Sequence, residues 1–335
     1  MYNISNKMKK PIKVTVTGST GNIGYSLLFK IANGEMFGKD QQVDLTMLGV
    51  YPGAGAMRVG LAMELEDCAY NQLSSMRSTT DLDEGFDGAN WIIMLGCAPR
   101  KKGMERADLL EKNGRMFIGQ GASIARCAAK DVRVLVVGNP CNTNAWIAMN
   151  NAQGIPTDRW FALTRLDENR AKAQLARKAG VHVSQVSQMC VWGNHSSTQF
   201  PDFYNAKIDG KPVLDVIDDE EWLKTDFIRT VRNRGSAVIE ERGASSAASA
   251  ASAIVDTVHS VIHPTPDGDF HSIGVCSDGS YGTQKGLITS MPIRSDGNNI
   301  EIVQGLQIND FARSQIDASV RELQEEADTF NSLAF

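Results

Sequence analysis

Residues 12–24 of this chain read IKVTVTGSTGNIG, and the architecture of the first half can be worked out from them. The opening run, Ile12–Thr17, is short and rich in β-branched residues, which predicts a strand. Glycines follow at positions 18, 21 and 24, and residues 22–33 carry apolar side chains at helical spacing. We therefore predict a strand, a glycine-rich turn and a helix in direct succession.

A turn of this kind is suited to hold a pyrophosphate. Gly18 permits the tight turn, Gly21 lets the backbone approach a phosphate, and Gly24 lets the helix pack closely on the strand. The phosphate would lie on the amides at the helix N-terminus, around Asn22 and Ile23. The spacing is G-x-x-G-x-x-G, not the commoner G-x-G-x-x-G, so an ordinary glycine turn is the alternative. A Walker A loop is excluded because no Gly-Lys-Ser/Thr follows.

The rest of the first half repeats the alternation of strand and helix. Apolar runs at 43–48, 91–95 and 132–137 predict further strands, and the last two are mostly apolar, as in strands buried on both faces of a parallel sheet. This pattern favours a doubly wound α/β domain.

The pattern changes to a mixed α+β one after about residue 165. We predict a strand at 186–192, a hairpin at Asp209-Gly210, one long Ala/Ser-rich helix at 235–261, antiparallel strands at 273–275, 287–292 and 300–303, and an amphipathic helix at 308–332. The chain is therefore predicted to divide into a dinucleotide-binding domain, 1–164, and a second domain, 165–335.

The composition narrows the class of protein. The chain has 335 residues, with 34 Lys and Arg against 39 Asp and Glu, a net charge of −5 that argues against nucleic acid as a partner. Hydrophobic residues make up 42%, yet no apolar run approaches the roughly 18–20 residues of a membrane span. Residues 1–11 show no secretory signal, and six widely spaced cysteines indicate free thiols. We expect a cytoplasmic protein without a membrane partner.

Several polar residues follow predicted strands, where ligands bind in α/β folds. His195 and Asn139 each come after a strand, while Asp167 and Arg170 share one face of a predicted helix. Residues 98–106 form a loop rich in Lys and Arg. Taken singly these are a satisfied histidine, a surface ion pair and a solvated loop. Their joint occurrence after a nucleotide loop favours a catalytic site.

The end of the second strand bears on the choice of cofactor. An acidic residue there would bond the ribose hydroxyls of NAD and repel the 2′-phosphate of NADP, but this chain has Gly49. Arg58 could approach such a phosphate, although a solvated helix arginine explains it equally well. NAD and NADP both remain open, with a slight preference for NADP.

These motifs resemble the lactate/malate dehydrogenase family over nearly the whole chain. The nearest likeness is to its malate dehydrogenases, in the cytosolic-type and chloroplast NADP-type branch. The stretches that carry the resemblance are TGSTGNIGYSLL, MELEDC, PRKKGMERADLL, VVGNPCNTNA, LTRLDENRAKAQLA, WGNHSSTQFPDF and GASSAASAAS. The cysteine-bearing terminal extensions of the chloroplast type are not in this sequence, so we expect no thiol regulation of that kind.

The resemblance implies a Rossmann-type domain followed by a catalytic domain, and reversible hydride transfer between NAD(P)H and oxaloacetate giving (S)-malate. His195 would be the general acid/base and Asp167 its orienting partner. Arg170 would bind the substrate's C1 carboxylate, and Arg106 would polarise its carbonyl. Arg100 would pair with the distal carboxylate, where a lactate dehydrogenase has a neutral residue.

The same resemblance implies the remaining contacts. Asn139 would bind both substrate and cofactor, and the expected cofactor-binding residues are Gly18, Gly21, Asn22, Ile23, Gly24, Gly49, Asn113, Gln120, Val137 and Asn139. A homodimer is implied and no metal is expected, because the His259/His263 pair lacks the Glu of a zinc motif. The alternatives are a lactate dehydrogenase-like 2-hydroxy acid dehydrogenase and a non-catalytic dinucleotide-sensing protein.

Overall fold

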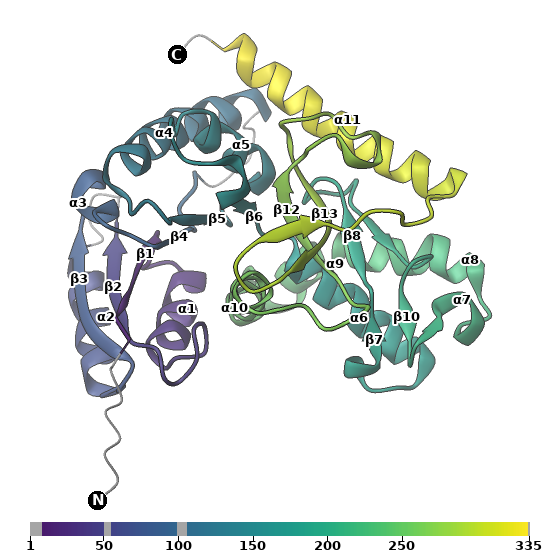
Figure 1. The fold of residues 1–335 in the computed structure, drawn as a ribbon, viewed down its shortest axis with the longest axis horizontal. Coiled ribbons are helices and arrows are strands. Elements are labelled where there is room, and N and C mark those ends of the chain that lie inside the picture. The colour runs from purple at the N-terminus through teal and green to yellow at the C-terminus, as the bar shows by residue number, and fades with distance from the viewer. Residues whose placement is uncertain (1–8, 50–54, 99–105, 334–335) are drawn as a thin grey trace, which may run out of the picture.

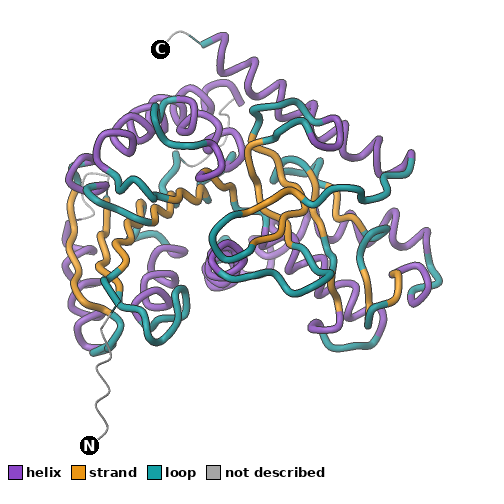
Figure 2. The backbone as a smooth tube through the Cα atoms, in the orientation of Figure 1, coloured by secondary structure: helices purple, strands orange, loops and turns teal. Residues whose placement is uncertain are grey.

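A computed structural model describes residues 9–49, 55–98 and 106–333. Its centre is one sheet of nine strands in the order β14-β13-β12-β6-β5-β4-β1-β2-β3 (Figures 1 and 2). The first six strands pair in parallel. They are β1 (Ile12–Thr17), β2 (Val43–Leu48), β3 (Leu73–Thr79), β4 (Trp91–Met94), β5 (Arg133–Val136) and β6 (Trp160–Ala162). This confirms the predicted α/β fold with a doubly wound parallel sheet.

Helices cover both faces of the parallel strands (Figure 1). From the first half these are α1 (Asn22–Ala32), α2 (Gly55–Asp67), α3 (Leu82–Phe86), α4 (Arg106–Cys127), α5 (Cys141–Asn150) and the short turn η1 (Thr157–Arg159). Two apolar cores result. One packs α1 and α2 against one face, and the other packs α3, α4 and α5 against the opposite face. Such double cover explains why β4 is buried along its whole length, as its apolar sequence predicts.

The second half of the chain builds onto the same sheet. Strand β12 (His271–Cys276) pairs antiparallel with β6 and is followed outward by β13 (Ile288–Ser295) and β14 (Ile300–Ile302). The smaller sheets are formed by β7 (Val186–Ser187), β10 (Lys207–Ile208) and β11 (Lys211–Pro212), and by β8 (Cys190–Trp192) and β9 (Phe200–Asp202).

The remaining helices pack around these strands. They are α6 (Arg165–Ala179), η2 (Val183–Gln185), α7 (Val213–Val216), α8 (Glu220–Trp222), the π-helical turn η3 (Leu223–Phe227), α9 (Ile228–Arg242), α10 (Ala248–Ile262), η4 (Ser280–Gly282) and α11 (Asp310–Ser332). Helix α10 packs against α1 of the first half, and α11 packs against α4 and α5. Contacts on both faces of the sheet therefore join the two halves.

Local sequence signals locate several of these elements correctly. The predicted hairpin is present, because Asp209 and Gly210 take φ values of +50° and +76° between β10 and β11. The terminal helix begins where Asn309 caps it by accepting a hydrogen bond from the amide of Ala312 at 2.8 Å. The six cysteines are free thiols, as predicted.

Two predictions for the second half are wrong in detail. The single helix expected at 235–261 is two helices, because α9 ends at Arg242, followed by the capping residue Gly243 with a φ of +71°, and α10 begins only at Ala248. The strand expected at 186–192 is divided into β7 and β8 by Gln188, whose φ is +54°.

Two strands of the first half, β3 and β6, are not predicted by the sequence patterns, since β3 is largely polar and β6 has three residues.

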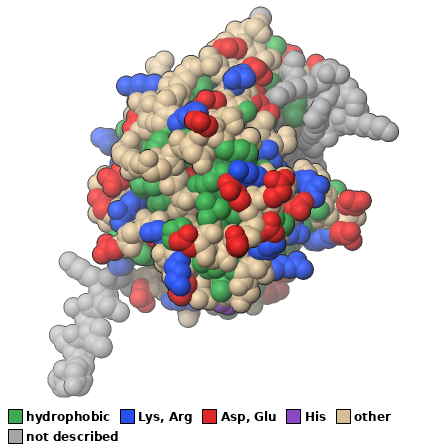
Figure 3. Space-filling model, turned by 90° about the vertical axis from the view of Figure 1, so that its right-hand side faces the viewer, with side chains coloured by type: hydrophobic (Ala, Val, Ile, Leu, Met, Phe, Trp, Pro, Cys, Tyr) green, Lys and Arg blue, Asp and Glu red, His purple; other side chains and the backbone are tan. Residues whose placement is uncertain are grey.

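The surface mixes charges of both signs. On the face shown in Figure 3, Lys and Arg side chains are interspersed with Asp and Glu. None of the described helices is long and apolar enough to cross a membrane. Within the described ranges, no group of three or more His, Cys, Asp or Glu is arranged to hold a metal ion.

The contact between β6 and β12 provides a test of the shared sheet. A Cβ at Gly274 would lie 2.7 Å from the Cβ of Ala162, so Gly274→Ala should crowd the two strands apart. Overpacking of this kind costs about 1–3 kcal/mol, which denaturant unfolding would measure. Gly119→Ala in α4 is the matched control, because open space surrounds Gly119 and alanine favours a helix. Equal stability of the two variants would contradict the prediction.

Candidate active site

Ends of the parallel strands and parts of the second half meet around a cavity of about 300 Å³. The first half contributes Ile23, Val137 and Asn139, and the second half contributes Arg170 and His195. Residues from α9, α10 and the segment between them also line it. Five residues predicted for the site from widely separated motifs therefore border one space, at the edge of the sheet where α/β folds bind ligands.

The glycine turn forms one side of this region. Gly18 has a φ of +63°, and a Cβ there would lie 2.9 Å from the backbone of Gly96, which follows β4. A Cβ at Gly24 would lie 2.4 Å from the carbonyl oxygen of Ser19, so the helix can approach the turn only with glycine. Gly21 is the N-cap residue of α1 and has no side chain that could cap the helix. The first amides of α1 are therefore available to a phosphate.

Asp167 is the buried centre of the polar group. It lies in the first turn of α6, has no exposed side-chain surface, and uses both carboxylate oxygens. One oxygen is hydrogen-bonded to Nδ1 of His195, and the other accepts from Nη1 of Arg170 at 2.9 Å. With Nδ1 occupied, the His195 nitrogen left for a ligand is Nε2. One carboxylate thus orients an imidazole and a guanidinium that both line the cavity.

Asn142 supports His195 from the first half. Its Oδ1 accepts the backbone N–H of His195 at 3.0 Å, and its Nδ2 donates to the carbonyl of Ile288 at 3.1 Å. The side chain is fully buried at the beginning of α5. Within GNPCNTN, Asn139 is predicted for the site and Asn142 is not. The signal was a second asparagine in the same strand-end motif, but only the tertiary contact reveals its partner.

The electrostatics favour a protonatable imidazole beside an ionised carboxylate. Burial alone lowers the pKa of His195, but the charge of Asp167 and its hydrogen bond outweigh burial and Arg170, so the net pKa is raised. Burial raises the pKa of Asp167, yet His195 and Arg170 together hold it below its usual range. A histidine in this state can donate a proton to a substrate oxygen and recover it.

The region around Gly49 lies at the end of β2. A Cβ on Gly49 would lie 2.2 Å from Nη1 of Arg58, which makes a long hydrogen bond of 3.5 Å to the Gly49 carbonyl. The Nε of Arg58 is buried and has no hydrogen-bond partner within the ranges that the structure describes. The guanidinium therefore occupies the position from which an acidic side chain at Gly49 would extend.

Two predicted cofactor residues lie buried on α4. The Oδ1 of Asn113 accepts the N–H of Ala98 at 2.7 Å, while its Nδ2 has no hydrogen-bond partner in the described part of the chain. Neither side-chain amide atom of Gln120 has a hydrogen-bond partner among the described residues, and the side chain is 1% exposed. The hydroxyl of Ser19 in the glycine turn is also buried, with no hydrogen-bond partner from residues 9–49, 55–98 or 106–333. Such orphaned polar atoms fit a region that receives a polar ligand.

Arg100 lies outside the described residues. Arg106 is the first residue of α4, but its side chain also lies outside the described part. The two histidines that suggested a metal pair, His259 and His263, pack ring against ring at the end of α10, with centroids 5.5 Å apart.

Comparison with protein-family models matches both halves of the chain. Residues 12–161 match the lactate/malate dehydrogenase NAD-binding domain, and residues 164–333 match the lactate/malate dehydrogenase alpha/beta C-terminal domain.

Solved structures give the same result. Malate dehydrogenase from Naegleria fowleri is 42% identical with a TM-score of 0.93, over 98% of this chain and 100% of that one. Trichomonas vaginalis lactate dehydrogenase, in complex with NADH and oxamate, is 34% identical with a TM-score of 0.90, over 96% and 100%. Malate dehydrogenase from Salinibacter ruber, at 20% identity and a TM-score of 0.79 over 96% and 98%, shares the fold.

The fold is thus that of an oxidoreductase with a Rossmann-like NAD-binding domain. The chain belongs to the lactate/malate dehydrogenase family.

The buried pair makes a prediction about protonation. In Asp167→Asn the charge that raises the pKa of His195 is removed while burial remains, so the pKa of His195 should fall below the usual value of about 6.5. An NMR titration of the imidazole protons measures this shift, with His195→Asn to assign the signal. The control is Asp219→Asn, an exposed carboxylate paired with Lys178. A histidine pKa that is the same in both variants would refute the assigned cause.

Proposed function

We propose that this protein is a malate dehydrogenase, which catalyses the reversible reduction of oxaloacetate to (S)-malate with NADH or NADPH. The observation that carries the proposal is the His195–Asp167–Arg170 arrangement beside a cavity bordered by the dinucleotide-binding half. It joins a proton donor to a cation suited to a carboxylate. A 2-hydroxy or 2-keto acid carries its carboxylate and its hydroxyl or keto oxygen on neighbouring carbons. Its binding site therefore needs a cation and a proton donor side by side.

Proton transfer is the part assigned to His195. During reduction its Nε2 donates a proton to the substrate's keto oxygen, which gains negative charge as the C–H bond forms. Asp167 stabilises the protonated imidazole beforehand and keeps it oriented through Nδ1. In the oxidation of malate His195 takes the hydroxyl proton. The bound nicotinamide dinucleotide supplies or accepts the hydride.

Substrate recognition is assigned to four residues. Arg170 holds the C1 carboxylate with the N–H groups not used by Asp167, and Asn139 donates to the substrate from the cavity wall. Arg106 is proposed to polarise the carbonyl and Arg100 to pair with the distal carboxylate, both from the family resemblance of their sequence. Arg100 distinguishes this proposal from the alternative, a lactate dehydrogenase, whose substrate lacks the second carboxylate.

The dinucleotide is proposed to lie along the glycine turn. Its phosphates would contact the amides near Gly18, Gly21 and Asn22, beside Ile23, and Gly24 allows α1 its close approach. Its nicotinamide end would meet the region of Val137 and Asn139, which border the same cavity as His195. We assign Asn113 and Gln120 to the same cofactor, because their amides are buried with unused hydrogen-bonding capacity.

We further propose that NADP is accepted, from the charge at the end of β2. Gly49 offers no carboxylate to bind the ribose hydroxyls, and Arg58 places a cation against the Gly49 carbonyl. A 2′-phosphate would find attraction there instead of repulsion. The division at residue 164, a homodimer and a cytoplasmic location also remain part of the proposal.

Arg100→Gln should reduce kcat/KM for oxaloacetate while leaving the fold intact. Truncating one partner of a desolvated charge pair costs about 2–5 kcal/mol, which is about 30-fold to several thousand-fold in rate. Steady-state kinetics with oxaloacetate and with pyruvate measure the effect. The control is Lys102→Gln in the same basic segment, which should change little. Brisk turnover of pyruvate by the parent protein, with none of oxaloacetate, would instead identify a lactate dehydrogenase.

Gly49→Asp should raise kcat/KM for NADH relative to that for NADPH. The new carboxylate would bond the ribose hydroxyls, and the flexible end of Arg58 can move aside to admit it. Arg58→Met should lower the NADPH rate alone. Kinetics with both cofactors at fixed oxaloacetate measure the ratio. If neither variant moves the ratio, this pair does not determine cofactor choice.

A further inference from the structure

A second cavity, of about 700 Å³, lies at the opposite edge of the parallel sheet from the candidate active site. Ile12, Trp91 and Arg133, the first residues of β1, β4 and β5, line it. Gly18 and Gly138 follow the other ends of β1 and β5. The two cavities have no described lining residue in common, and this volume is in the range of small-molecule sites.

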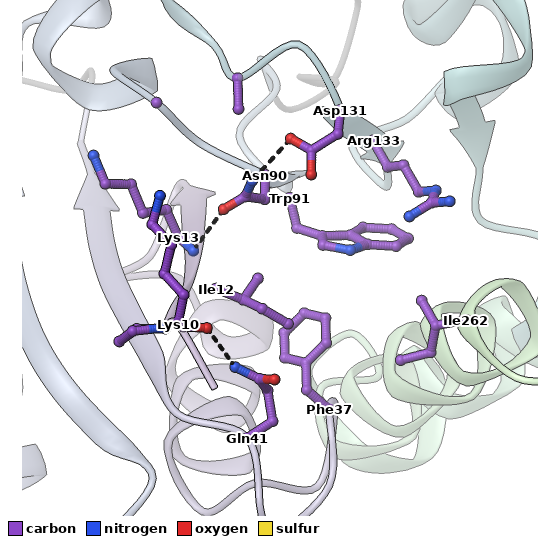
Figure 4. Close-up of a pocket in the computed structure, with 13 residues that line it drawn as sticks. Lys10, Ile12, Lys13, Phe37, Gln41, Asn90, Trp91, Asp131, Arg133 and Ile262 are labelled. Atoms are coloured by element: carbon purple, nitrogen blue, oxygen red, sulfur yellow. Dashed lines mark hydrogen bonds between the residues drawn. The ribbon is translucent and has the colours of Figure 1, made fainter. Parts of the chain in front are cut away.

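The cavity has an apolar border. Figure 4 shows the ring of Trp91 on one side, and Phe37 and Ile262 opposite it. The two aromatic rings contact each other, with centroids 6.3 Å apart at an interplanar angle of 56°, and together form one continuous apolar border. Trp91 is 3% exposed and Phe37 is 9% exposed, so packing holds both in place. This border suits a flat apolar group, because burial and ring contacts both contribute to binding.

The charged residues at the rim are mostly positive. Lys10, Lys13 and Arg133 line the cavity, against one carboxylate, Asp131, whose Oδ1 already accepts from Asn90 at 2.9 Å. The Nζ of Lys13 is 4.0 Å from a carboxylate oxygen of Asp87, the limit of an ion pair. The excess of cations favours an anionic group in the cavity.

Arg133 is the cation placed for that role. Its guanidinium lies 5.9 Å from the ring centroid of Trp91, and its Nη2 donates to the neutral carbonyl of Asn298 at 2.7 Å. Among the described residues no carboxylate oxygen lies within 4.0 Å of its nitrogens. Burial lowers the pKa of Arg133 and the positive charge of Arg159 lowers it further, while the carboxylates of Asp131 and Asp158 oppose these two effects only in part. An anion beside Arg133 would offset both effects.

We propose that this cavity is a binding site for a small aromatic anion, with its ring against the apolar border formed by Trp91, Phe37 and Ile262 and its charged group at Arg133. A carboxylate and a phosphate both fit the guanidinium fork, since each accepts two parallel N–H bonds. The site is independent of the proposed reaction, because it borders different ends of the strands from the dinucleotide region. Ligand and dinucleotide therefore bind at the same time.

The test uses isothermal titration calorimetry on the full chain, alone and saturated with NADH or NADPH. The ligands are 2-naphthoate, 2-naphthyl phosphate, the neutral 2-naphthamide and inorganic phosphate. One of the two naphthyl anions should bind with equal affinity in the presence and absence of dinucleotide, and which one does identifies the anionic group. The amide and inorganic phosphate should bind at least about tenfold more weakly, since each lacks the charge or the ring.

Variants locate the site. Arg133→Met should weaken binding of the preferred naphthyl anion about tenfold or more, and Lys10→Met, an exposed change that leaves the core untouched, should weaken it severalfold. The control, Lys211→Met on β11, should leave the affinity unchanged. Full competition by dinucleotide, equal binding of 2-naphthamide, or unchanged affinity in both cavity variants would overturn the proposal.

Discussion

The antiparallel pairing of β12 with β6 is the constraint on which the geometry of the site depends. It makes one sheet from the two halves of the chain, with Gly274 opposite Ala162. Helix α6 begins three residues after β6, so Asp167 is brought to the carboxyl end of the parallel strands. On the next strand outward, Ser290 of β13 exchanges backbone hydrogen bonds with Gly193, which places the segment before His195. Two independent connections to one sheet thus position the two members of the buried pair.

The site is held by buried polar groups that satisfy one another across the two halves. Asn142 of α5 joins His195 to Ile288 of β13, and Ser319 of α11 accepts the N–H of Asn194 at 2.8 Å. Gly193 makes the close approach possible, because its φ is +90° and a Cβ would lie 2.2 Å from the Ser319 hydroxyl. Such networks orient a side chain well because each unsatisfied member would be costly. By the same principle the buried side-chain amide of Gln120, which has no partner among the described residues, supports the proposed cofactor contact.

The electrostatics of each cavity depend on the charged groups that line it and not on the net charge of the protein. The net charge of −5 is a sum over the whole chain, both signs are mixed on the face shown in Figure 3, and the sum gives no information about either cavity. At the candidate active site the carboxylate of Asp167 balances Arg170 and raises the pKa of His195. At the opposite edge of the sheet Arg133 and two lysines outnumber Asp131. The interaction energy between two charges decreases with distance and is screened by water and salt. The neighbours within a few ångströms therefore determine the ionisation and the partners of each group.

The sequence alone determined the elements whose signals are local. Alternation of apolar runs and helical spacing gave the parallel sheet, and glycine spacing gave the turn after β1, because both depend on residues close together in the chain. Tertiary structure decided the rest. The break at Gly243, the division of β7 from β8 and the addition of β12 to β6 depend on packing with distant residues. The role of Asn142 and the cavity at Arg133 could not be predicted from the sequence either. The residue that Asn142 contacts and the residues that line the cavity lie far apart in the chain. His195, Asp167 and Arg170 could be selected by resemblance, but only the folded chain shows that His195 and Arg170 both bond to the carboxylate of Asp167.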